Sequence, residues 1–293
     1  MNARVRPSPL VRLILSLAAF GLLAVVVARP AAQQRAGGGP APMQIFLLIG
    51  QSNMAGRGAV EDADRVAHPR VWMFDRSGTW VPAVEPMHFD KPAIVGVGPG
   101  RAFAITLAEE AATMRVGLVP AAVGGSPIDA WRPGAYYKPT KSHPWDDAMR
   151  RAKAAMQAGT LAGILWHQGE SDATAALADD YASKLDDLVG RLRGELGAPD
   201  VPFIAGQMGR FSERPWDAAK VTVDRAHRDL PRRVSRTAFV SSEGLTHTGD
   251  EIHFDAASAR ELGRRYARAY QELVAAAPSA PGRAPADASV GAR

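Results

Sequence analysis

The order of apolar segments along the chain constrains its fold more than any other feature. Short apolar runs with the length of strands alternate with longer segments of helical period. The strand-like runs cover residues 44–49, 70–74, 116–123, 161–166, 201–206 and 237–241, and the helical segments cover residues 100–114, 145–157, 175–196, 214–229 and 256–275. Several runs are apolar on both faces, as expected when helices cover both sides of a sheet. The pattern predicts an α/β fold with a mostly parallel sheet, and residues 75–98 are expected to form loops or a small hairpin.

The two ends of the chain differ in composition from the middle. Residues 1–32 place three arginines before a mostly apolar stretch at 13–28, which is typical of a signal peptide. Residues 33–43 have the composition of a linker, and residues 276–293, rich in proline and small residues, that of a disordered tail. We therefore expect one folded domain over residues 44–275, exported to the periplasm or the outside of the cell. No stable membrane association is expected after cleavage, and an uncleaved anchor is the alternative.

Charge and cysteine content exclude several classes of protein. The formal net charge is +5, from 35 basic and 30 acidic side chains. Removing the four arginines of residues 1–32 leaves 31 basic side chains, a net charge of about +1, too small for a basic nucleic-acid-binding surface. The chain has no cysteine, which excludes disulfides and thiolate chemistry. No nucleic-acid partner is expected, and the sequence sets no oligomeric state.

Ser52 follows the most informative apolar run. We interpret residues 45–49 as a buried strand. This strand ends at Gly50, and Ser52 comes two residues after the glycine. The carboxyl ends of parallel strands build the sites of open α/β sheets, so Ser52 is placed where a nucleophile would lie. The alternative is that residues 50–53 form only a turn, since Gly, Ser and Asn are turn residues.

Asp250 and His253 are candidates for activating this serine. A serine hydroxyl needs a base, usually a histidine that a carboxylate orients. The two residues are three positions apart just before the last helical segment, a spacing that can place both side chains on one side of a turn. The alternative is that Asp250 only caps the helix and His253 only belongs to its first turn.

Three segments offer donors for the oxyanion that would develop during ester cleavage. They are the backbone N–H of Ser52, an N–H at Gly124 or Gly125, and the side-chain amide of Gln168. Glycine allows the backbone to approach a ligand closely, although a tight turn explains the pair equally well. Gln168 and Asn53 could instead be structural amides that hold loops together.

Four segments together resemble the SGNH hydrolase superfamily. They read Gly-Gln-Ser-Asn-Met-Ala-Gly at 50–56, Val-Gly-Gly-Ser-Pro-Ile-Asp-Ala-Trp at 123–131, Trp-His-Gln-Gly-Glu-Ser-Asp at 166–172 and Asp-Glu-Ile-His-Phe-Asp at 250–255. Within the superfamily they are similar to the sialate O-acetylesterase domain, which includes acetylxylan esterases of carbohydrate esterase family six. The resemblance covers about residues 44–273. It implies a three-layer α/β/α sandwich with a mostly parallel, flavodoxin-like sheet, and a serine esterase that removes O-acetyl groups from carbohydrate without a metal or cofactor.

The resemblance also implies roles for single residues. Ser52 matches the nucleophile, His253 the base and Asp250 its orienting acid, and no residue matches a metal ligand. The oxyanion positions match Ser52, Gly125 in preference to Gly124, and Gln168. Candidate substrate contacts are Gln51, Asn53, Trp131 and Arg132. Glutamines at 51 and 168 replace the Asp and Asn common in the wider superfamily, and both replacements fit the sialate-type branch.

Three other interpretations use different residues. Residues 169–173 resemble the serine elbow of α/β-hydrolases, with Ser171 as the nucleophile. A metal-dependent hydrolase could use His167, Glu170, His247, Asp250 or His253, although their spacing matches no helical two-histidine zinc motif. A non-catalytic protein that binds acetylated glycans could stack sugar rings on Trp131, Trp145 or Trp166. The sequence does not decide which acetylated glycan is the substrate.

Overall fold

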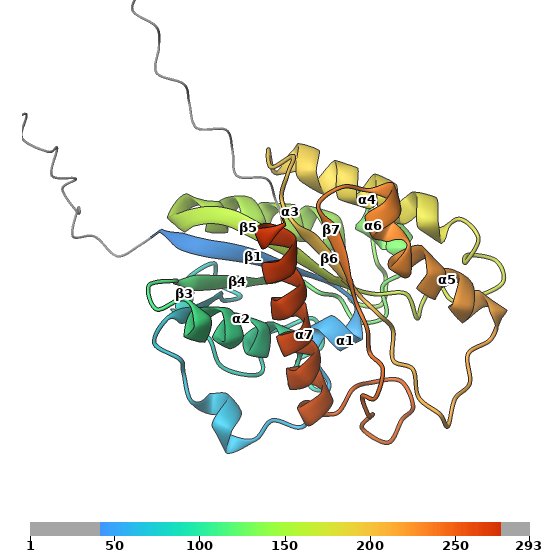
Figure 1. Ribbon diagram of the computed structural model, residues 1–293, viewed down its shortest axis with the longest axis horizontal. Helices are drawn as coiled ribbons and strands as arrows, with labels where there is room; N and C mark the ends of the chain where they lie inside the picture. Colours follow the sequence, from blue (N-terminus) through green and yellow to red (C-terminus); the bar gives the residue numbers. More distant parts are fainter. Residues whose placement is uncertain (1–41, 277–293) are drawn as a thin grey trace, which may run out of the picture. The chain divides into compact units, whose positions relative to one another are not determined.

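A single sheet with the strand order β3-β2-β4-β1-β5-β6-β7 runs through the computed structural model, which describes residues 42–276 (Figure 1). The strands are Met43–Gly50 (β1), Val71–Phe74 (β2), Trp80–Pro82 (β3), Val116–Pro120 (β4), Gly159–His167 (β5), Phe203–Gly206 (β6) and Thr237–Val240 (β7). Every pair is parallel except β2 with β3, which form a hairpin at the edge of the sheet. The predicted mostly parallel sheet is therefore confirmed.

The order of the central strands is that of flavodoxin-like folds. When β1, β4, β5, β6 and β7 are numbered in chain order, their spatial order is 2-1-3-4-5. Such sheets bind ligands in the crevice where the winding of the chain reverses, between the first and third of these strands. Here that crevice lies at the carboxyl ends of β1 and β5. The flavodoxin-like expectation is confirmed, and the β2–β3 hairpin extends the sheet beyond it.

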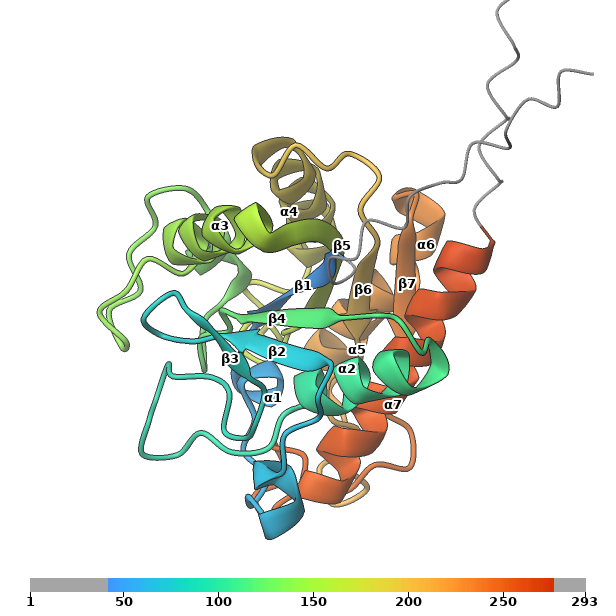
Figure 2. The ribbon, with the colours of Figure 1, turned by 90° about the vertical axis from the view of Figure 1, so that its left-hand side faces the viewer.

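Helices cover both faces of the sheet and complete the expected α/β/α sandwich (Figure 2). They are Ser52–Ala55 (α1), Pro99–Glu110 (α2), Pro144–Ala155 (α3), Tyr181–Glu195 (α4), Ala218–Arg228 (α5), Leu230–Arg233 (α6) and Ala256–Ala275 (α7). Helices α2 and α7 pack together on one face, and α3, α4 and α5 pack on the other. The sequence pattern does not predict α1 or α6, because one turn is too short to show a helical period.

Strand β1 shows why the apolar runs become central strands. Ile45, Leu47 and Ile49 point into the core beneath α3 and α4, whereas Phe46 and Leu48 point into the core beneath α2 and α7. All five side chains are fully buried. Each contributes roughly 1.5–3 kcal/mol on burial, so a polar residue at any of these positions would oppose this placement of the strand.

Two helices begin later than their sequence pattern predicts. Helix α4 begins at Tyr181 instead of 175, because residues 175–180 form turns that bury Ala178 in the core. Helix α5 begins at Ala218 instead of 214, because Asp217 caps it by accepting a hydrogen bond from the N–H of Lys220 (2.8 Å). The cap residue therefore sets the start of α5 more strongly than the apolar period does.

The predicted signal peptide, the linker up to residue 41 and the tail beyond Ala276 lie outside the described residues. Met43, at the end of the predicted linker, is already the first residue of β1. Between residues 42 and 276, no helix combines the length and the hydrophobicity that crossing a membrane requires.

Candidate active site

Ser52 is the first residue of α1, which follows β1 at the carboxyl edge of the sheet. Gly50 makes the turn between them possible, because its φ is +123° and a Cβ there would lie 2.1 Å from the carbonyl oxygen of His167. The N–H of Gln51 donates to the same carbonyl at 2.8 Å. These contacts join the ends of β1 and β5 and place Ser52 at the crevice between them.

His253 approaches Ser52 from the loop before α7. Its Nε2 lies 2.9 Å from Oγ of Ser52, and its Nδ1 lies 2.5 Å from Oδ2 of Asp250. Oδ1 of Asp250 accepts the N–H groups of Ile252 (2.9 Å) and His253 (2.8 Å), which holds the loop in a turn. The structure therefore brings together the three residues predicted as nucleophile, base and orienting acid.

The alternative reading of Asp250 as a helix cap is wrong. The cap of α7 is Asp255, whose Oδ1 accepts from the N–H of Ser258 at 2.8 Å. Burial raises the pKa of Asp250, but hydrogen bonds from His253 and from the N–H of Ile252 outweigh burial and lower the pKa to about 2. The carboxylate is thus ionised at neutral pH. It can stabilise the positive charge that an imidazole acquires when it takes a proton.

The backbone N–H groups near Ser52 differ in whether they already have an acceptor. The N–H of Gly124 donates to Oδ2 of Asp90 at 2.7 Å. No acceptor within residues 42–276 bonds the N–H of Ser52 or of Gly125. Gly125 has a φ of +81°, a conformation that favours glycine. These observations support Gly125 over Gly124 as an oxyanion donor, together with Ser52.

Gln168 does not fit the predicted role of oxyanion donor. It is fully buried, and its Nε2 donates to a carboxylate oxygen of Asp172 and to the carbonyl of Ser126 (3.2 Å). Its Oε1 accepts the hydroxyl of Tyr181 at 2.6 Å. Both amide hydrogens are used inside the core, so neither remains for a substrate. Gln168 is a structural amide that joins the loop after β5 to the loop after β4.

Ser171 and Asp172 strengthen the same junction. Oγ of Ser171 donates to the carbonyl of Gly125 at 2.9 Å, and Oδ2 of Asp172 accepts the N–H of Ile128 at 2.9 Å. Among the described residues, no histidine is a hydrogen-bond partner of Ser171. The serine-elbow interpretation therefore has no base, and Ser171 instead holds the peptide of Gly125 in place.

Asn53 forms hydrogen bonds with the loop on both sides of His253. Its Nδ2 donates to the carbonyl of Ile252 (3.1 Å), and its Oδ1 accepts the N–H of Phe254 (3.1 Å). The second hydrogen of Nδ2 goes to Oε1 of Glu170 at 2.8 Å. Asn53 is only 3% exposed and its polar atoms hold the loop, which argues against its predicted role as a substrate contact.

Gln51 is also a buried side chain, 3% exposed, and not a substrate contact. Its Oε1 lies 3.4 Å from the N–H groups of Gly169 and Ser171, which start the loop after β5. Glu170 in the same loop carries the carboxylate that holds Asn53, a role that sequence reasoning missed. Its position directly after an apolar strand was the available signal. Burial raises the pKa of Glu170, while Asn53 and the nearby His253 lower it.

The tryptophans predicted to stack on sugar belong to the core. Trp131 and Trp166 are fully buried and pack edge to face with ring centres 5.5 Å apart. Trp145 is 3% exposed. Their burial argues against the prediction of Trp131 as a substrate contact. Arg132 is half exposed and lies 3.2 Å from Asp129, and its role as a substrate contact stays a prediction.

Of the residues considered for a metal site, Asp250 and His253 are in direct contact, at 2.5 Å. His167 is fully buried with Nδ1 3.2 Å from the hydroxyl of Tyr266, and burial lowers its pKa to about 3. Nδ1 of His247 accepts the N–H groups of Gly249 and Glu251 and so holds a turn. Over residues 42–276, no three metal-ligating side chains are grouped so that they could hold an ion.

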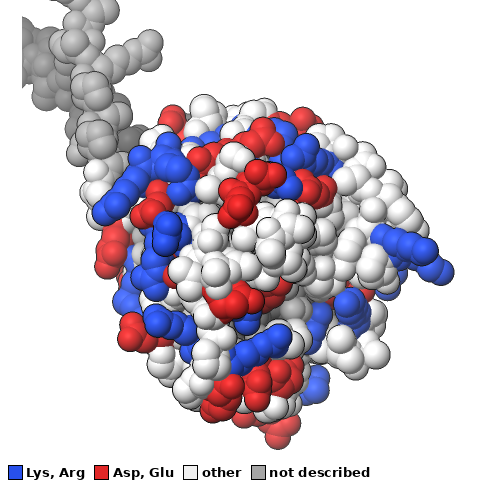
Figure 3. Space-filling model, turned by 90° about the vertical axis from the view of Figure 1, so that its right-hand side faces the viewer, with Lys and Arg blue, Asp and Glu red and all other residues white. Residues whose placement is uncertain are grey.

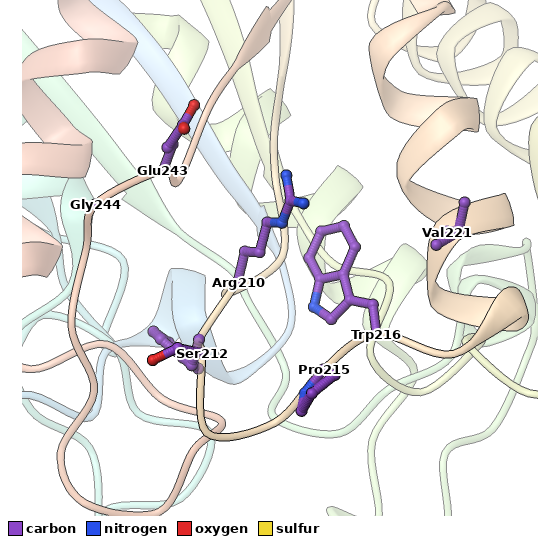
Figure 4. Close-up of a pocket in the computed structure, with 8 residues that line it drawn as sticks. Arg210, Ser212, Pro215, Trp216, Val221, Glu243 and Gly244 are labelled. Carbon is purple, nitrogen blue, oxygen red and sulfur yellow. The ribbon is translucent and has the colours of Figure 1, made fainter.

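Grooves border two parts of the carboxyl edge of the sheet. One, of about 430 Å³, borders residues 121–123 after β4 and includes Asp90 and Arg151. The other, of about 510 Å³, lies between the loops after β6 and β7. Figure 4 shows Arg210 and Trp216 next to each other in the second groove, where the guanidinium lies 5.7 Å from the centre of the indole. Either groove has the volume of a small-molecule site.

Comparison with known proteins places the chain among carbohydrate esterases. The family model described as carbohydrate esterase, sialic acid-specific acetylesterase, matches residues 42–272. A probable carbohydrate esterase from Arabidopsis thaliana is 31% identical over 255 residues, which are 78% of this chain and 90% of that protein.

Solved structures show the same fold. The X-ray structure of an Arabidopsis thaliana protein has a TM-score of 0.69 at 29% identity and covers 79% of this chain and 98% of its own. The structure of NanS has a TM-score of 0.64 at 18% identity and covers 80% of this chain and 98% of its own. The structure of a carbohydrate acetylesterase from Xanthomonas citri has a TM-score of 0.61 at 20% identity and covers 78% of this chain and 56% of its own. The resemblance to SGNH-type esterases is thus confirmed. The chain belongs to the sialic acid-specific acetylesterase family of carbohydrate esterases, and it is a carboxylic ester hydrolase.

Proposed function

We propose that the protein is a serine esterase that removes O-acetyl groups from carbohydrate through an acetyl-enzyme. One observation carries the proposal: Oγ of Ser52 lies 2.9 Å from Nε2 of His253, whose other ring nitrogen lies 2.5 Å from Asp250. A hydroxyl, an imidazole and an ionised carboxylate in this order form the arrangement that activates a serine nucleophile.

The proposed reaction has two halves. Nε2 of His253 takes the proton of Ser52 as Oγ attacks the acetyl carbonyl carbon. The N–H groups of Ser52 and Gly125 hold the oxyanion, and each such donor stabilises a transition state by about 3 kcal/mol. The tetrahedral intermediate then breaks its bond to the sugar oxygen, which receives the proton from His253. In the second half His253 takes a proton from water, which attacks the acyl carbon of the acetyl-enzyme. The bond between this carbon and Oγ of Ser52 then breaks, Oγ receives the proton from His253, and acetate leaves.

Two side chains lie close to Gly125, one of the proposed oxyanion donors. A Cβ on Gly125 would lie 3.0 Å from the hydroxyl of Tyr137 and 3.9 Å from Nζ of Lys91. The nature of the sugar, whether of acetylxylan or sialate type, is left to the experiment.

The test measures acetate release from a panel of acetylated glycans, together with hydrolysis of p-nitrophenyl acetate. Ser52→Ala is expected to lose about 10⁴-fold or more in kcat. Ser171→Ala removes the alternative nucleophile and should lower kcat by no more than about tenfold, the effect of losing one hydrogen bond to the carbonyl of Gly125. Equal activity of wild type and Ser52→Ala would refute the serine mechanism. Activity lost with a chelator and restored by metal would favour a metal-dependent hydrolase, and glycan binding without acetate release would favour a binding protein.

We also propose that the chain is exported, on the strength of the arginines and the apolar stretch in residues 1–32. Sequencing the N-terminus of the protein isolated from its native cells tests this. A mature chain that starts between residues 29 and 43 is expected, and a chain that keeps its first residues would support the uncleaved anchor.

A further inference from the structure

One groove at the carboxyl edge of the sheet carries more positive than negative charge. The groove of about 430 Å³ next to Gly124 is lined by four cationic and two acidic side chains, namely Arg76, Lys141, Arg150, Arg151, Asp90 and Asp147. Asp90 is paired with Arg57 (3.3 Å) and Asp147 with Arg150 (2.6 Å). The other three cations form no ion pair within residues 42–276. Elsewhere charges are mixed: basic and acidic side chains are interspersed over the left and lower parts of the surface in Figure 3.

Arg151 supplies a buried positive charge at the base of this groove. The residue is only 6% exposed, its guanidinium donates to three backbone carbonyls, and it lies 4.6 Å from the ring centre of Phe89. Burial and the charge of Arg150 lower its pKa to about 10, so it stays charged at neutral pH. Carbonyl groups satisfy its hydrogen bonds but bring no net negative charge. An anion in the groove would therefore gain from a charge that water screens poorly.

The groove is connected to Gly125, a proposed oxyanion donor, through Asp90, which lines the groove and accepts the N–H of the neighbouring Gly124. The hydroxyl of Tyr137 and Nζ of Lys91 both approach the position that a Cβ of Gly125 would take, at 3.0 and 3.9 Å. Neither group has a hydrogen-bond partner within the described part of the chain. Asp90, whose carboxylate receives the N–H of Gly124, connects this point to the groove wall.

We propose that this groove binds an acidic sugar, one that carries a carboxylate and lies next to the acetylated residue of a glycan chain. The inference rests on the proposed function, because it takes Ser52 as the point where the acetyl ester is cleaved. Arg76 can bind a carboxylate with two parallel hydrogen bonds, Lys141 adds a point charge in the groove, and Lys91 adds another beside Gly125. A glycan that contains uronic acids supplies carboxylates that can form ion pairs with these cations.

The second groove shows that this charge is not a general property of the sheet edge. Only one cation, Arg210, and one carboxylate, Glu243, line it (Figure 4). An anionic glycan gains no net attraction there. The preference for an acidic sugar is thus assigned to the groove next to Gly124 alone.

The experiment compares two substrates that differ only in charge: chemically acetylated oligogalacturonate and the same oligomer after carboxyl reduction. Acetate release gives kcat and KM for the wild type and for Arg76→Gln/Lys141→Gln. The control is Arg225→Gln/Arg232→Gln, two exposed arginines on α5 and α6, which changes the net charge by the same amount. Each variant is also assayed with p-nitrophenyl acetate.

The wild type is expected to show a lower KM for the charged oligomer than for its neutral counterpart. Arg76→Gln/Lys141→Gln should raise the KM for the charged oligomer about fivefold, with kcat and the neutral oligomer unaffected. At high ionic strength the difference between the oligomers should shrink. The control variant should keep the wild-type preference.

Equal KM values for the two oligomers with the wild type would overturn the inference, as would an equal effect of the control variant. If neither oligomer releases acetate, the proposed function fails on these substrates. A binding measurement then tests whether the groove binds an acidic sugar. Calorimetric titration of unacetylated oligogalacturonate into Ser52→Ala should then show binding that Arg76→Gln/Lys141→Gln weakens. No binding, or binding unchanged by those substitutions, would overturn the inference independently of catalysis.

Discussion

Replacing Asn53 with alanine should both destabilise the protein and slow the reaction. The substitution removes the hydrogen bonds to Ile252, Phe254 and Glu170, at 3.1, 3.1 and 2.8 Å. Each of the two bonds to the backbone contributes about 1 kcal/mol, and the bond to the carboxylate about 2 kcal/mol. The free energy of unfolding should therefore fall by about 3–4 kcal/mol. Because the loop also carries His253, a shift of the ring by about 1 Å would lower kcat by roughly 100-fold.

Two measurements test this reasoning. Urea denaturation gives the free energy of unfolding, and hydrolysis of p-nitrophenyl acetate gives kcat and KM. Glu170→Met serves in a double-mutant cycle, because Asn53→Ala leaves the Glu170 carboxylate without its donor while the double variant has no carboxylate to strand. The double variant should thus lose about 1–2 kcal/mol less than the sum of the single variants.

The competing prediction, in which Asn53 contacts the substrate, has a different signature. A substrate contact would raise KM, leave kcat nearly unchanged and cost little stability. The structural role of Asn53 in holding the His253 loop would be refuted if the variant showed a raised KM and a free energy of unfolding within about 1 kcal/mol of the wild type.

Two further predictions concern buried polar groups. Gln168→Met should lower the free energy of unfolding by about 2 kcal/mol, because Tyr181 and Asp172 lose their hydrogen-bond partner. The same substitution should lower kcat by less than about tenfold. A 100-fold loss of kcat without loss of stability would support Gln168 as an oxyanion donor. Burial raises the pKa of Glu85 from 4.5 to about 8, so the folded protein holds a proton that the unfolded chain releases. This contribution to stability is complete below pH 4.5 and is lost as the pH rises through 8. Glu85→Gln should flatten the fall in Tm between pH 5 and 9, and an unchanged slope in thermal melts would contradict the assignment.

Local patterns in the sequence predicted those features of the site whose geometry is set by residues close together in the chain. The strand that ends at Gly50 places Ser52 at the sheet edge, since a strand buried on both faces needs an apolar run and the turn needs glycine. The three-residue spacing of Asp250 and His253 sufficed for the same reason: one turn brings the two side chains together.

The roles of the amides and the tryptophans depended on contacts that the sequence does not encode locally. Gln168 is as polar as any oxyanion donor, but the positions of Tyr181 and Asp172 decide where its hydrogens go. Trp131 has the composition of a sugar-stacking residue, yet packing against Trp166 removes its faces from solvent.

By itself, then, the sequence determined the layered α/β fold, and it predicted Ser52 at a strand edge and Asp250 beside His253 without excluding a plain turn or a helix cap. Only the tertiary structure decided that His253 meets Ser52 across 201 residues. Among residues 42–276 it also decided that Gly125 and not Gly124 keeps a free N–H, and that cations without an ion pair line the groove next to Gly124. The physical reason is that apolar periodicity and short spacings act within one element. Hydrogen-bond partners and charge balance, in contrast, are set by loops from different strands that meet at one edge of the sheet.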